Sequence, residues 1–243
     1  MSVELIINWR KVIEMSEMSK MVVVIAGSGK LVTSILKNKE LQSKYCFQKW
    51  DTFDKKQKAV VLHAGSGRQL DEIKQYCSSH QALLIQLSTG QEITGYNNSF
   101  PLIVCPNISL LIVKFMYMLE KFGEHFKDYE IQLIESHQSE KKSIPGTALF
   151  FSDSLKLDHE KIISVREKKV QQEVLNIPDE FMNSHAYHKI QIKDNDAELV
   201  FETKVYGHES YVKGVEKLLN VVSEKKIDIK IFNITDLIAL KYL

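Results

Sequence analysis

The sequence lacks a surplus of either charge and any long hydrophobic run, and each absence excludes a class of protein. The 243 residues carry 32 lysines and arginines against 31 aspartates and glutamates, a formal net charge of +1. This balance gives no field that would attract nucleic acid or an anionic membrane. No apolar run approaches the ~20 residues needed to span a bilayer. The composition therefore predicts a soluble, cytoplasmic protein with no nucleic-acid or membrane partner.

Cysteine is scarce as well. Cys46, Cys77 and Cys105 lie in or beside apolar runs, and no two of them form a CxxC pair. Buried free thiols are typical of a reducing compartment, whereas disulfide frameworks and metal sites need paired cysteines. We therefore expect neither disulfides nor a metal site. The hydrophobic content of 44% is enough for one large core or two smaller ones.

The chain changes character at Met21. A continuous apolar run, MVVVIA, ends at Gly27 and Gly29, and a helical pattern follows. A strand, a glycine turn and a helix open a dinucleotide-binding unit, in which a pyrophosphate lies on the helix N-terminus. Val32 stands where the last glycine of the pattern is expected. The turn alone is therefore consistent with a nucleotide site and equally with a structural βα turn.

Further short apolar runs continue this alternation at residues 45–50, 59–63, 82–87 and 102–105. Each ends in small or polar residues, as an open parallel sheet requires at the edge where its ligand lies. Asp51 follows the second run about twenty residues after the glycine turn, where a carboxylate can accept hydrogen bonds from an adenine ribose. The same aspartate could simply cap a turn.

The second half of the chain has a different order. Its segments predict a long buried helix at 108–122, a strand at 129–137 and a helix that begins at Gly146 and covers 146–151. An irregular charged stretch follows at 155–180, then a hairpin at 187–204, a helix at 210–222, and a closing strand with a short helix at 227–243. Strands that alternate with helices and are then followed by successive strands indicate two domains. The fold class is α/β, with an N-terminal Rossmann-type parallel sheet domain and a C-terminal α+β domain with a mixed sheet. The predicted boundaries are an extension at 1–20, a nucleotide-binding domain at 21–107 to which 223–243 returns, and a substrate-binding and oligomerisation domain at 108–222.

The stretch 129–149 contains the clearest chemical signal. A polar loop with His137, Lys141 and Lys142 leads to Gly146 and Thr147 at the predicted helix start. A helix start presents unpaired N–H groups and the positive end of a dipole, which suits a carboxylate or phosphate. The arrangement fits an anionic substrate that must also receive a proton.

The run EIQLIESHQSEKKSIPGTAL resembles the signature of the dihydrodipicolinate reductase family, E-x-H-H-x-x-K-x-D-x-P-S-G-T-A. The matching positions are Glu135, His137, Lys141, Pro145, Gly146, Thr147 and Ala148. The segments 87–90, 104–109 and 207–219 are similar to other segments of the same family. The resemblance covers most of the chain from Met21 onward.

This resemblance implies an enzyme that reduces 4-hydroxy-tetrahydrodipicolinate (dihydrodipicolinate) to tetrahydrodipicolinate in lysine biosynthesis by the diaminopimelate pathway. The cofactor would be NADH or NADPH, the substrate a small dicarboxylate, and the assembly a homotetramer. His137 and Lys141 would donate protons, and three residues would bind substrate, namely Gln138, Gly146 and Thr147. The cofactor-binding residues would be Gly27, Gly29, Lys30, Asp51, Ser88, Thr89, Gly90 and Asn107. Asp51 favours a free ribose hydroxyl and Lys30 tolerates a phosphate, so both cofactors stay open.

The sequence also departs from the family pattern. Gln138 replaces the second histidine, Ser143 replaces the aspartate, and the serine between the proline and the glycine is missing. His188 could correspond to a histidine of a later family segment, whereas Arg166 is not matched to any position of the family pattern. Three hypotheses follow: a reductase of the usual substrate, a reductase of another small carboxylate, and a non-catalytic relative that serves as a binding or assembly module.

Overall fold

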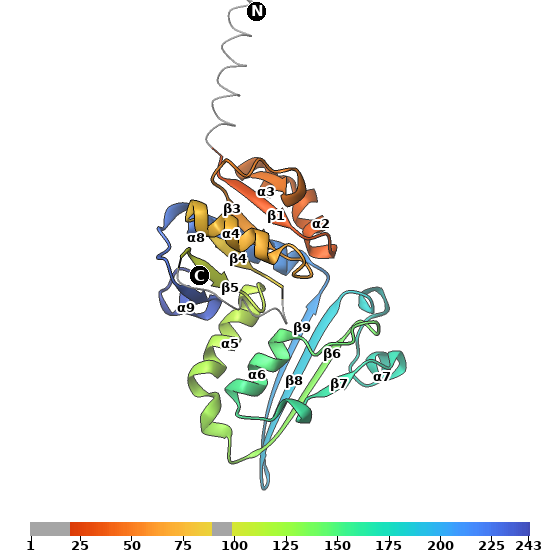
Figure 1. The fold of residues 1–243 in the computed structure, drawn as a ribbon. Helices are drawn as coiled ribbons and strands as arrows, with labels where there is room; N and C mark the ends of the chain where they lie inside the picture. The colour runs from red at the N-terminus through yellow and green to blue at the C-terminus, as the bar shows by residue number, and fades with distance from the viewer. Residues whose placement is uncertain (1–19, 89–98) are drawn as a thin grey trace, which may run out of the picture. The chain divides into compact units, whose positions relative to one another are not determined.

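The computed structural model describes residues 20–88 and 99–243, which form two compact units (Figure 1). The first unit contains the described residues up to Ile103 together with Val222–Ile231, and the second contains Val104–Val221 and Phe232–Leu243. No helix within these ranges is long and apolar enough to cross a membrane. The same ranges hold no cluster of histidine, cysteine and acidic residues that could bind a metal ion. The predicted domain boundaries at residues 107 and 222 stay a prediction.

A six-stranded sheet organises the first unit, and its strand order is β10-β5-β4-β3-β1-β2. The strands are β1 (Val22–Ala26), β2 (Cys46–Lys49), β3 (Val60–His63), β4 (Leu84–Gln86), β5 (Leu102–Val104) and β10 (Ile231–Asn233). β1 pairs in parallel with β2 and β3, and β3 pairs in parallel with β4. Four of the five residues of β1 are almost fully buried, as expected of a central strand covered on both faces. The predicted Rossmann-type parallel sheet is confirmed.

The helices of this unit follow its strands in the predicted alternation. They are α2 (Lys30–Lys37), α3 (Lys39–Lys44) and α4 (Leu70–His80), with a short 3-10 helix, η1 (Trp50–Thr52), after β2. Ile35 of α2 and Ile73 of α4 are fully buried. Their burial explains why short helices with few capping bonds are stable in this context, since packing of an apolar face contributes more than helix propensity.

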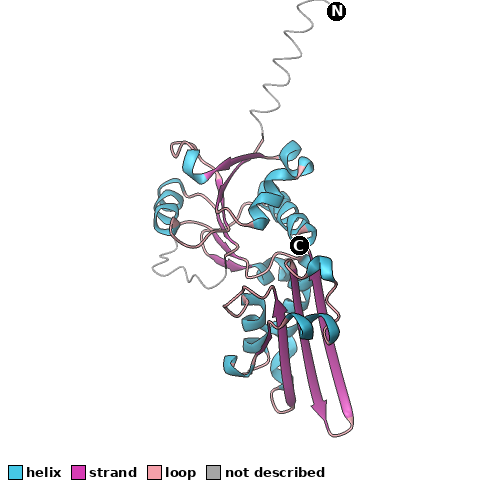
Figure 2. Cartoon of the chain, turned by 90° about the vertical axis from the view of Figure 1, so that its right-hand side faces the viewer, coloured by secondary structure: helices cyan, strands magenta, loops and turns pink. Residues whose placement is uncertain are grey.

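A four-stranded mixed sheet organises the second unit, and its order is β7-β6-β8-β9. The strands are β6 (Glu130–His137), β7 (Ile163–Val165), β8 (His185–Asp194) and β9 (Ala197–Tyr206). β6 runs parallel to β7 and antiparallel to β8, while β8 and β9 form the predicted hairpin around Asn195. Figure 2 shows the long strands of this sheet side by side. The predicted mixed sheet is therefore confirmed.

Five helices lie wholly or mainly in this unit: α5 (Leu110–Phe122), α6 (Gly146–Ser154), α7 (Lys168–Glu173), α8 (Glu209–Glu224) and α9 (Ile234–Ala239). The 3-10 helices η2, η3 and η4 are Gly123–Phe126, His159–Lys161 and Asp179–Phe181. Met116 of α5 and Phe151 of α6 are fully buried in one core with Leu133 and Ile190 of the sheet. The long apolar helix predicted at residues 108–122 is thus a core helix, and the helix predicted at Gly146 begins there.

The structure contradicts the prediction that residues 155–180 form an irregular, solvated segment. This segment contains β7 and α7, and Gln171 of α7 is fully buried. β7 is three residues long, which is too short to display an alternating pattern. It is held by pairing with β6, where Ser164 lies opposite Glu135, and not by an apolar face of its own.

Candidate functional site

The carboxylate of Glu135 is the centre of a polar cluster in the second unit. Glu135 lies on β6 and is completely buried. Its Oε2 accepts a hydrogen bond from Nδ1 of His137 at 2.9 Å, because residues two apart on a strand share a face. Its Oε1 accepts from Nη2 of Arg166 at 2.5 Å and from the Ser164 hydroxyl. Arg166 Nε also donates to the Lys141 carbonyl at 2.9 Å, which ties the loop after β6 to the cluster.

These contacts fix the charge of each group. Burial alone would raise the pKa of Glu135, but the hydrogen bonds from His137, Arg166 and Ser164 outweigh it and lower the pKa to about 2. Burial lowers the pKa of His137 below its usual 6.5, with Glu135 opposing the shift and the charges of Lys141 and Arg166 adding to it. At neutral pH the carboxylate is therefore ionised and the imidazole neutral. Because Nδ1 donates to Glu135, Nε2 carries the lone pair.

His137 is reachable from outside the cluster, since 16% of its side chain is exposed. Lys141 follows four residues later and is partly buried. Burial lowers the pKa of Lys141, with the Arg166 charge adding to the shift and Glu135 opposing it. A lone pair on an imidazole and an ammonium with a lowered pKa are both suited to exchanging protons with a bound ligand.

A second histidine lies beneath His137. His188 is buried on β8 directly opposite Glu135, and its ring centroid is 5.6 Å from that of His137 in an edge-on arrangement. Burial lowers the pKa of His188 to about 3, so this ring is neutral. Its Nδ1 lies 3.2 Å from the Thr203 hydroxyl, and its Nε2 has no hydrogen-bond partner among the described residues. His188 is therefore a buried, neutral ring in edge-on contact with His137.

The opposite face of β6 is fixed by another set of bonds. The Ser136 hydroxyl bonds to Nε2 of His185 at 3.0 Å and accepts from Nε2 of Gln171 at 2.9 Å. Gln171 also donates to the His137 carbonyl at 2.7 Å. All three side chains are buried. The backbone at His137 is therefore held from α7 as well as from the sheet.

The helix start that is predicted to suit a carboxylate or phosphate is the start of α6. Pro145 precedes the helix, and its carbonyl accepts from the N–H groups of Ala148 and Leu149 at 3.0 and 3.1 Å. The N–H groups of Gly146 and Thr147 come before these and lie outside the helical ladder. The Thr147 hydroxyl accepts from Nδ2 of Asn107 at 3.0 Å, and Oδ1 of Asn107 accepts from the Ser109 N–H at 2.8 Å. Asn107 is predicted to bind the cofactor, but both its amide nitrogen and its amide oxygen make hydrogen bonds that join the starts of α5 and α6.

The first unit contains a cavity of about 610 Å³ at the carboxyl ends of β1 and β3. Its lining consists of Gly27, Ser28 and Gly29 of the turn, Asp51, and the loop 63–69 between β3 and α4. The strand order reverses between β1 and β3, because β2 lies on one side of β1 and β3 on the other. Such a reversal is where open α/β sheets bind their ligands.

Gly27 is required by the geometry of this cavity. Its φ is +132°, and a Cβ there would lie 2.5 Å from the Ala64 carbonyl oxygen. Gly29 is different, since a Cβ there would meet nothing within 4 Å and would project into open space. The loss of the third glycine at Val32 is compatible with this turn, because Val32 is buried inside α2.

Of the other residues predicted to bind the cofactor, Asp51 lines this cavity, whereas Lys30 and Ser88 are not among its lining residues. Asp51 is exposed and accepts a hydrogen bond from Nε2 of Gln69. Ser88 lies 3.0 Å from Nδ1 of the buried His63, which is also 2.8 Å from Oε1 of Gln86. Lys30 is exposed at the first position of α2. Thr89 and Gly90 lie outside the described residues.

Sequence reasoning missed the partners of Glu135. Arg166 and Ser164 lie in the stretch predicted to be irregular, and Glu135 entered only as a motif position. One signal was present: Glu135 lies on the same strand face as His137, and a carboxylate on a buried face requires a cation. The chain has only three arginines, of which Arg166 alone belongs to its second half. Arg68 and Gln69, in the cavity of the first unit, gave no signal because the loop 63–69 is irregular.

Comparisons with known proteins give a consistent result. Residues 112–238 match the family described as "Dihydrodipicolinate reductase, C-terminus". The chain is 27% identical over 150 residues to 4-hydroxy-tetrahydrodipicolinate reductase 1, chloroplastic, of Arabidopsis thaliana, which is 56% of this chain and 43% of that protein. It is 29% identical over 129 residues to the probable 4-hydroxy-tetrahydrodipicolinate reductase 2, chloroplastic, of Oryza sativa subsp. japonica, covering 49% and 39%. The chain thus spans less than half the length of these curated relatives.

A solved structure extends the likeness to the whole fold. The dipicolinate-bound dihydrodipicolinate reductase from Paenisporosarcina sp. TG-14 aligns with a TM-score of 0.59 over 88% of this chain and 97% of that chain. The sequence identity of this pair is 18%. At that identity the alignment shows a shared fold, a parallel-sheet unit followed by a mixed-sheet unit.

Proposed function

The chain belongs to the dihydrodipicolinate reductase family, and from this premise we propose that it reduces 4-hydroxy-tetrahydrodipicolinate to tetrahydrodipicolinate with NADH or NADPH. The observation that carries the proposal is the Glu135–His137 pair beside Lys141 and Arg166. In this group Glu135 orients His137, which can carry a proton, and Lys141 and Arg166 supply positive charge nearby. A dicarboxylate substrate would be attracted by that charge and would receive the proton. The place in lysine biosynthesis, the homotetramer, the cytoplasmic location and the division of labour between the domains are part of the same proposal.

The protein's part in the reaction is to supply a proton. Reduction of a conjugated C=C bond leaves negative charge on carbon or nitrogen, which a positioned acid must quench. His137 is neutral in the free protein, with its lone pair on Nε2. A bound dianion raises the pKa of a neighbouring imidazole, so Nε2 gains its proton as substrate arrives. Glu135 stabilises the resulting imidazolium through Nδ1, and Lys141 is the second donor.

The substrate's carboxylates would be bound at the start of α6. The free N–H groups of Gly146 and Thr147 and the positive end of the helix dipole favour an anion there. Gln138 donates hydrogen bonds without charge. The Thr147 hydroxyl is already engaged by Asn107, so we assign its backbone, and not its side chain, to the substrate.

A reductase of another small carboxylate is the second candidate. The observation that favours it is the altered loop, in which Gln138 and Ser143 replace a histidine and an aspartate of the family pattern and one serine is missing. A neutral amide in place of an imidazole changes which acids fit, while the proton donor at His137 is unchanged.

The first unit fits a dinucleotide. Gly27 permits a close turn, and Gly29 leaves open space at the helix start for a pyrophosphate. Asp51 can accept from a ribose hydroxyl, and Ser88 lies at the end of a neighbouring strand. The bound cofactor would supply the hydride. Lys30, Thr89 and Gly90 complete the proposed set, whereas Asn107 acts through Thr147.

A coupled assay tests the proposal directly. Purified protein is added to dihydrodipicolinate synthase and its substrates, and the nicotinamide absorbance is followed with NADH and with NADPH. Oxidation that requires both the synthase and this protein is the expected result. Oxidation with another small unsaturated carboxylate but not with the synthase product would favour the second candidate. Dinucleotide binding without any turnover would favour a binding or assembly role.

Two glycine variants separate the fold of the turn from its use as a cofactor site. Gly27→Ala should lower the free energy of unfolding by about 1 to 3 kcal/mol, since alanine is strained at this φ and meets the Ala64 carbonyl. Gly29→Ala should leave stability within about 0.5 kcal/mol of the wild type, because its methyl group enters open space. We nevertheless expect Gly29→Ala to bind NADH at least about tenfold more weakly, a loss of about 1.4 kcal/mol.

Both quantities are measured on the same samples, by denaturant unfolding and by nicotinamide fluorescence. Unchanged NADH affinity in Gly29→Ala would place the pyrophosphate elsewhere and contradict the assignment of this cavity.

A further inference from the structure

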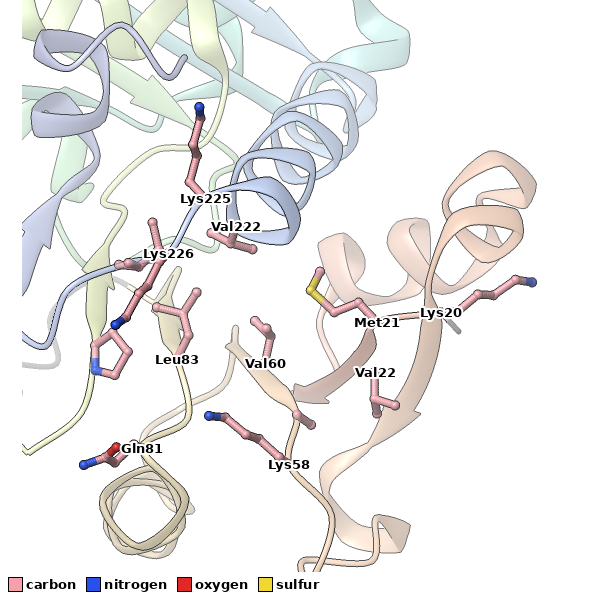
Figure 3. Close-up of a pocket in the computed structure, with 13 residues that line it drawn as sticks. Lys20, Met21, Val22, Lys58, Val60, Gln81, Leu83, Val222, Lys225 and Lys226 are labelled. Atoms are coloured by element: carbon pink, nitrogen blue, oxygen red, sulfur yellow. The ribbon is translucent and has the colours of Figure 1, made fainter. Parts of the chain in front are cut away.

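A second cavity lies at the opposite edge of the six-stranded sheet. It measures about 510 Å³ and is formed where β1, β3 and β4 begin, together with the chain after α8. All of its lining residues belong to the first unit. The Gly27–Gly29 turn lies at the carboxyl ends of the same strands. We call this second site the strand-start cavity, and define it by Met21, Lys58, Val60, Gln81, Leu83 and Lys226 (Figure 3).

The strand-start cavity has one polar side. In Figure 3 the amino groups of Lys58 and Lys226 extend toward the side on which Gln81 lies. Lys20 and Lys225 also belong to the lining, but their amino groups point away from the cavity. No aspartate or glutamate is among the described lining residues. Two positive charges and a neutral amide therefore face the cavity with no carboxylate to balance them.

The remaining walls are apolar. Met21, Val60 and Val222 are partly exposed toward this space, and Leu83 is buried behind it. A ligand that covered these side chains would remove apolar surface from water, at about 25 cal/mol for each Å² buried. The cavity volume lies within the range of about 300 to 1,000 Å³ typical of small-molecule sites.

The two lysines contrast with their neighbours in the same unit. Lys55 pairs with Glu72 at 3.4 Å, and Lys74 pairs with Asp71 at 2.7 Å. Across residues 20–88 and 99–243, neither Lys58 nor Lys226 makes an ion pair. Like charges that face the same cavity repel one another, and an anion bound to both turns this repulsion into attraction.

We propose that the strand-start cavity binds a small molecule with an anionic head, a carboxylate or a phosphate, and an apolar body. The head contacts Lys58, Lys226 and Gln81, and the body lies against Met21, Val60 and Val222. The site is separate from the residues assigned to the dinucleotide and to the reaction. Its occupancy is therefore independent of whether the protein is a reductase.

Calorimetric titration of the full chain tests this assignment with four probes. Octyl phosphate and octanoate are used below their critical micelle concentrations, octanol is used below its solubility limit, and inorganic phosphate is the fourth probe. The two amphiphilic anions should bind saturably, and the tighter of them identifies the preferred head. Inorganic phosphate and octanol should each bind at least about tenfold more weakly, because each lacks one half of the recognised chemistry. Equal binding of octanol, or saturable binding by neither amphiphilic anion, would overturn the proposal.

Two double variants with the same charge change locate the site. Lys58→Gln with Lys226→Gln should weaken the tighter anion by at least about tenfold. Lys20→Gln with Lys225→Gln removes two charges that point away from the cavity, and should weaken it by no more than about twofold. All four side chains lie at the surface, so both proteins should unfold at the wild-type denaturant concentration. Equal losses in the two variants would show a diffuse charge effect and no site.

Discussion

Replacing Glu135 by glutamine should lower the free energy of unfolding by about 3 kcal/mol at neutral pH, because it removes one charge of a buried pair and leaves the Arg166 guanidinium without its partner. The pKa of Glu135 gives a similar magnitude. Its decrease from 4.5 to about 2 corresponds to about 3 kcal/mol of preference for the ionised form. Denaturant unfolding measures the difference. Glu140→Gln, an exposed position on the following loop, should change stability by no more than about 0.5 kcal/mol.

The same variant should change how stability depends on pH. The folded pKa of Glu135 lies below the unfolded value, so its contribution is complete above pH 4.5 and is lost as the pH falls toward about 2. His188 acts over another window, because its folded pKa of about 3 lies below 6.5 and the unfolded chain binds its proton first. Stability should therefore decline from pH 6.5 downward in both proteins. Below pH 4.5 the wild type should decline more steeply than the variant, and parallel curves there would contradict the role of Glu135.

Local periodicity explains which parts of the fold were predictable. The valine-rich run of β1 is buried on both faces, and such a run reports its position in a parallel sheet without any partner being known. Residues 130–133 alternate because Ile131 and Leu133 face the core that α5 and α6 share with β6. The hairpin of β8 and β9 is likewise specified by alternation and a polar turn. Each of these signals lies within one continuous segment of the chain, the longest being the hairpin His185–Tyr206.

The candidate site could be predicted only in part, because its bonds connect residues far apart in the chain. His137 ends β6 and Lys141 lies in the loop that follows, so the two are only four residues apart and were found together. Arg166 lies 31 residues from Glu135, and Asn107 lies 40 residues from Thr147. No local sequence pattern predicts such pairs. β7, which brings Ser164 to Glu135, is too short to show the alternation of apolar and polar residues typical of a strand. The strand-start cavity is even harder to predict from local patterns, because its lining residues come from separate segments of the chain.

These long-range bonds also explain how the site can tolerate its altered loop. The position of His137 is fixed from three sides, by Glu135 on its own strand, by Gln171 of α7 at its carbonyl, and by pairing of β6 with β8. None of these contacts involves Gln138 or Ser143. The proposed proton donor is therefore held independently of the two substituted positions, which supports the proposal of a reductase with a changed substrate pocket.

His137→Gln should lower kcat of the proposed reaction by about 10² to 10⁴-fold, the usual contribution of a positioned acid. The amide can occupy the same space and bond to Glu135 but cannot deliver a proton. NADH affinity should stay within about twofold of the wild type, since His137 is not among the residues assigned to the dinucleotide. In the wild type kcat/KM should fall as the pH rises above the lowered pKa of His137, since fewer molecules then carry the proton, and the variant should lack that decline.

His159→Gln is the matched control for His137→Gln, because this exposed histidine also contacts a carboxylate, Asp153, at 2.7 Å and lies outside the cluster. It should retain kcat within about twofold, as expected of a surface substitution. Lys141→Met distinguishes the two proposed donors, since it removes the ammonium while keeping an apolar stem. If His137→Gln kept full activity while Lys141→Met lost it, the proton would come from Lys141, and His137 would only position the loop. A loss of kcat in His137→Gln together with its changed pH profile places the proton on Nε2, the atom that Glu135 leaves free.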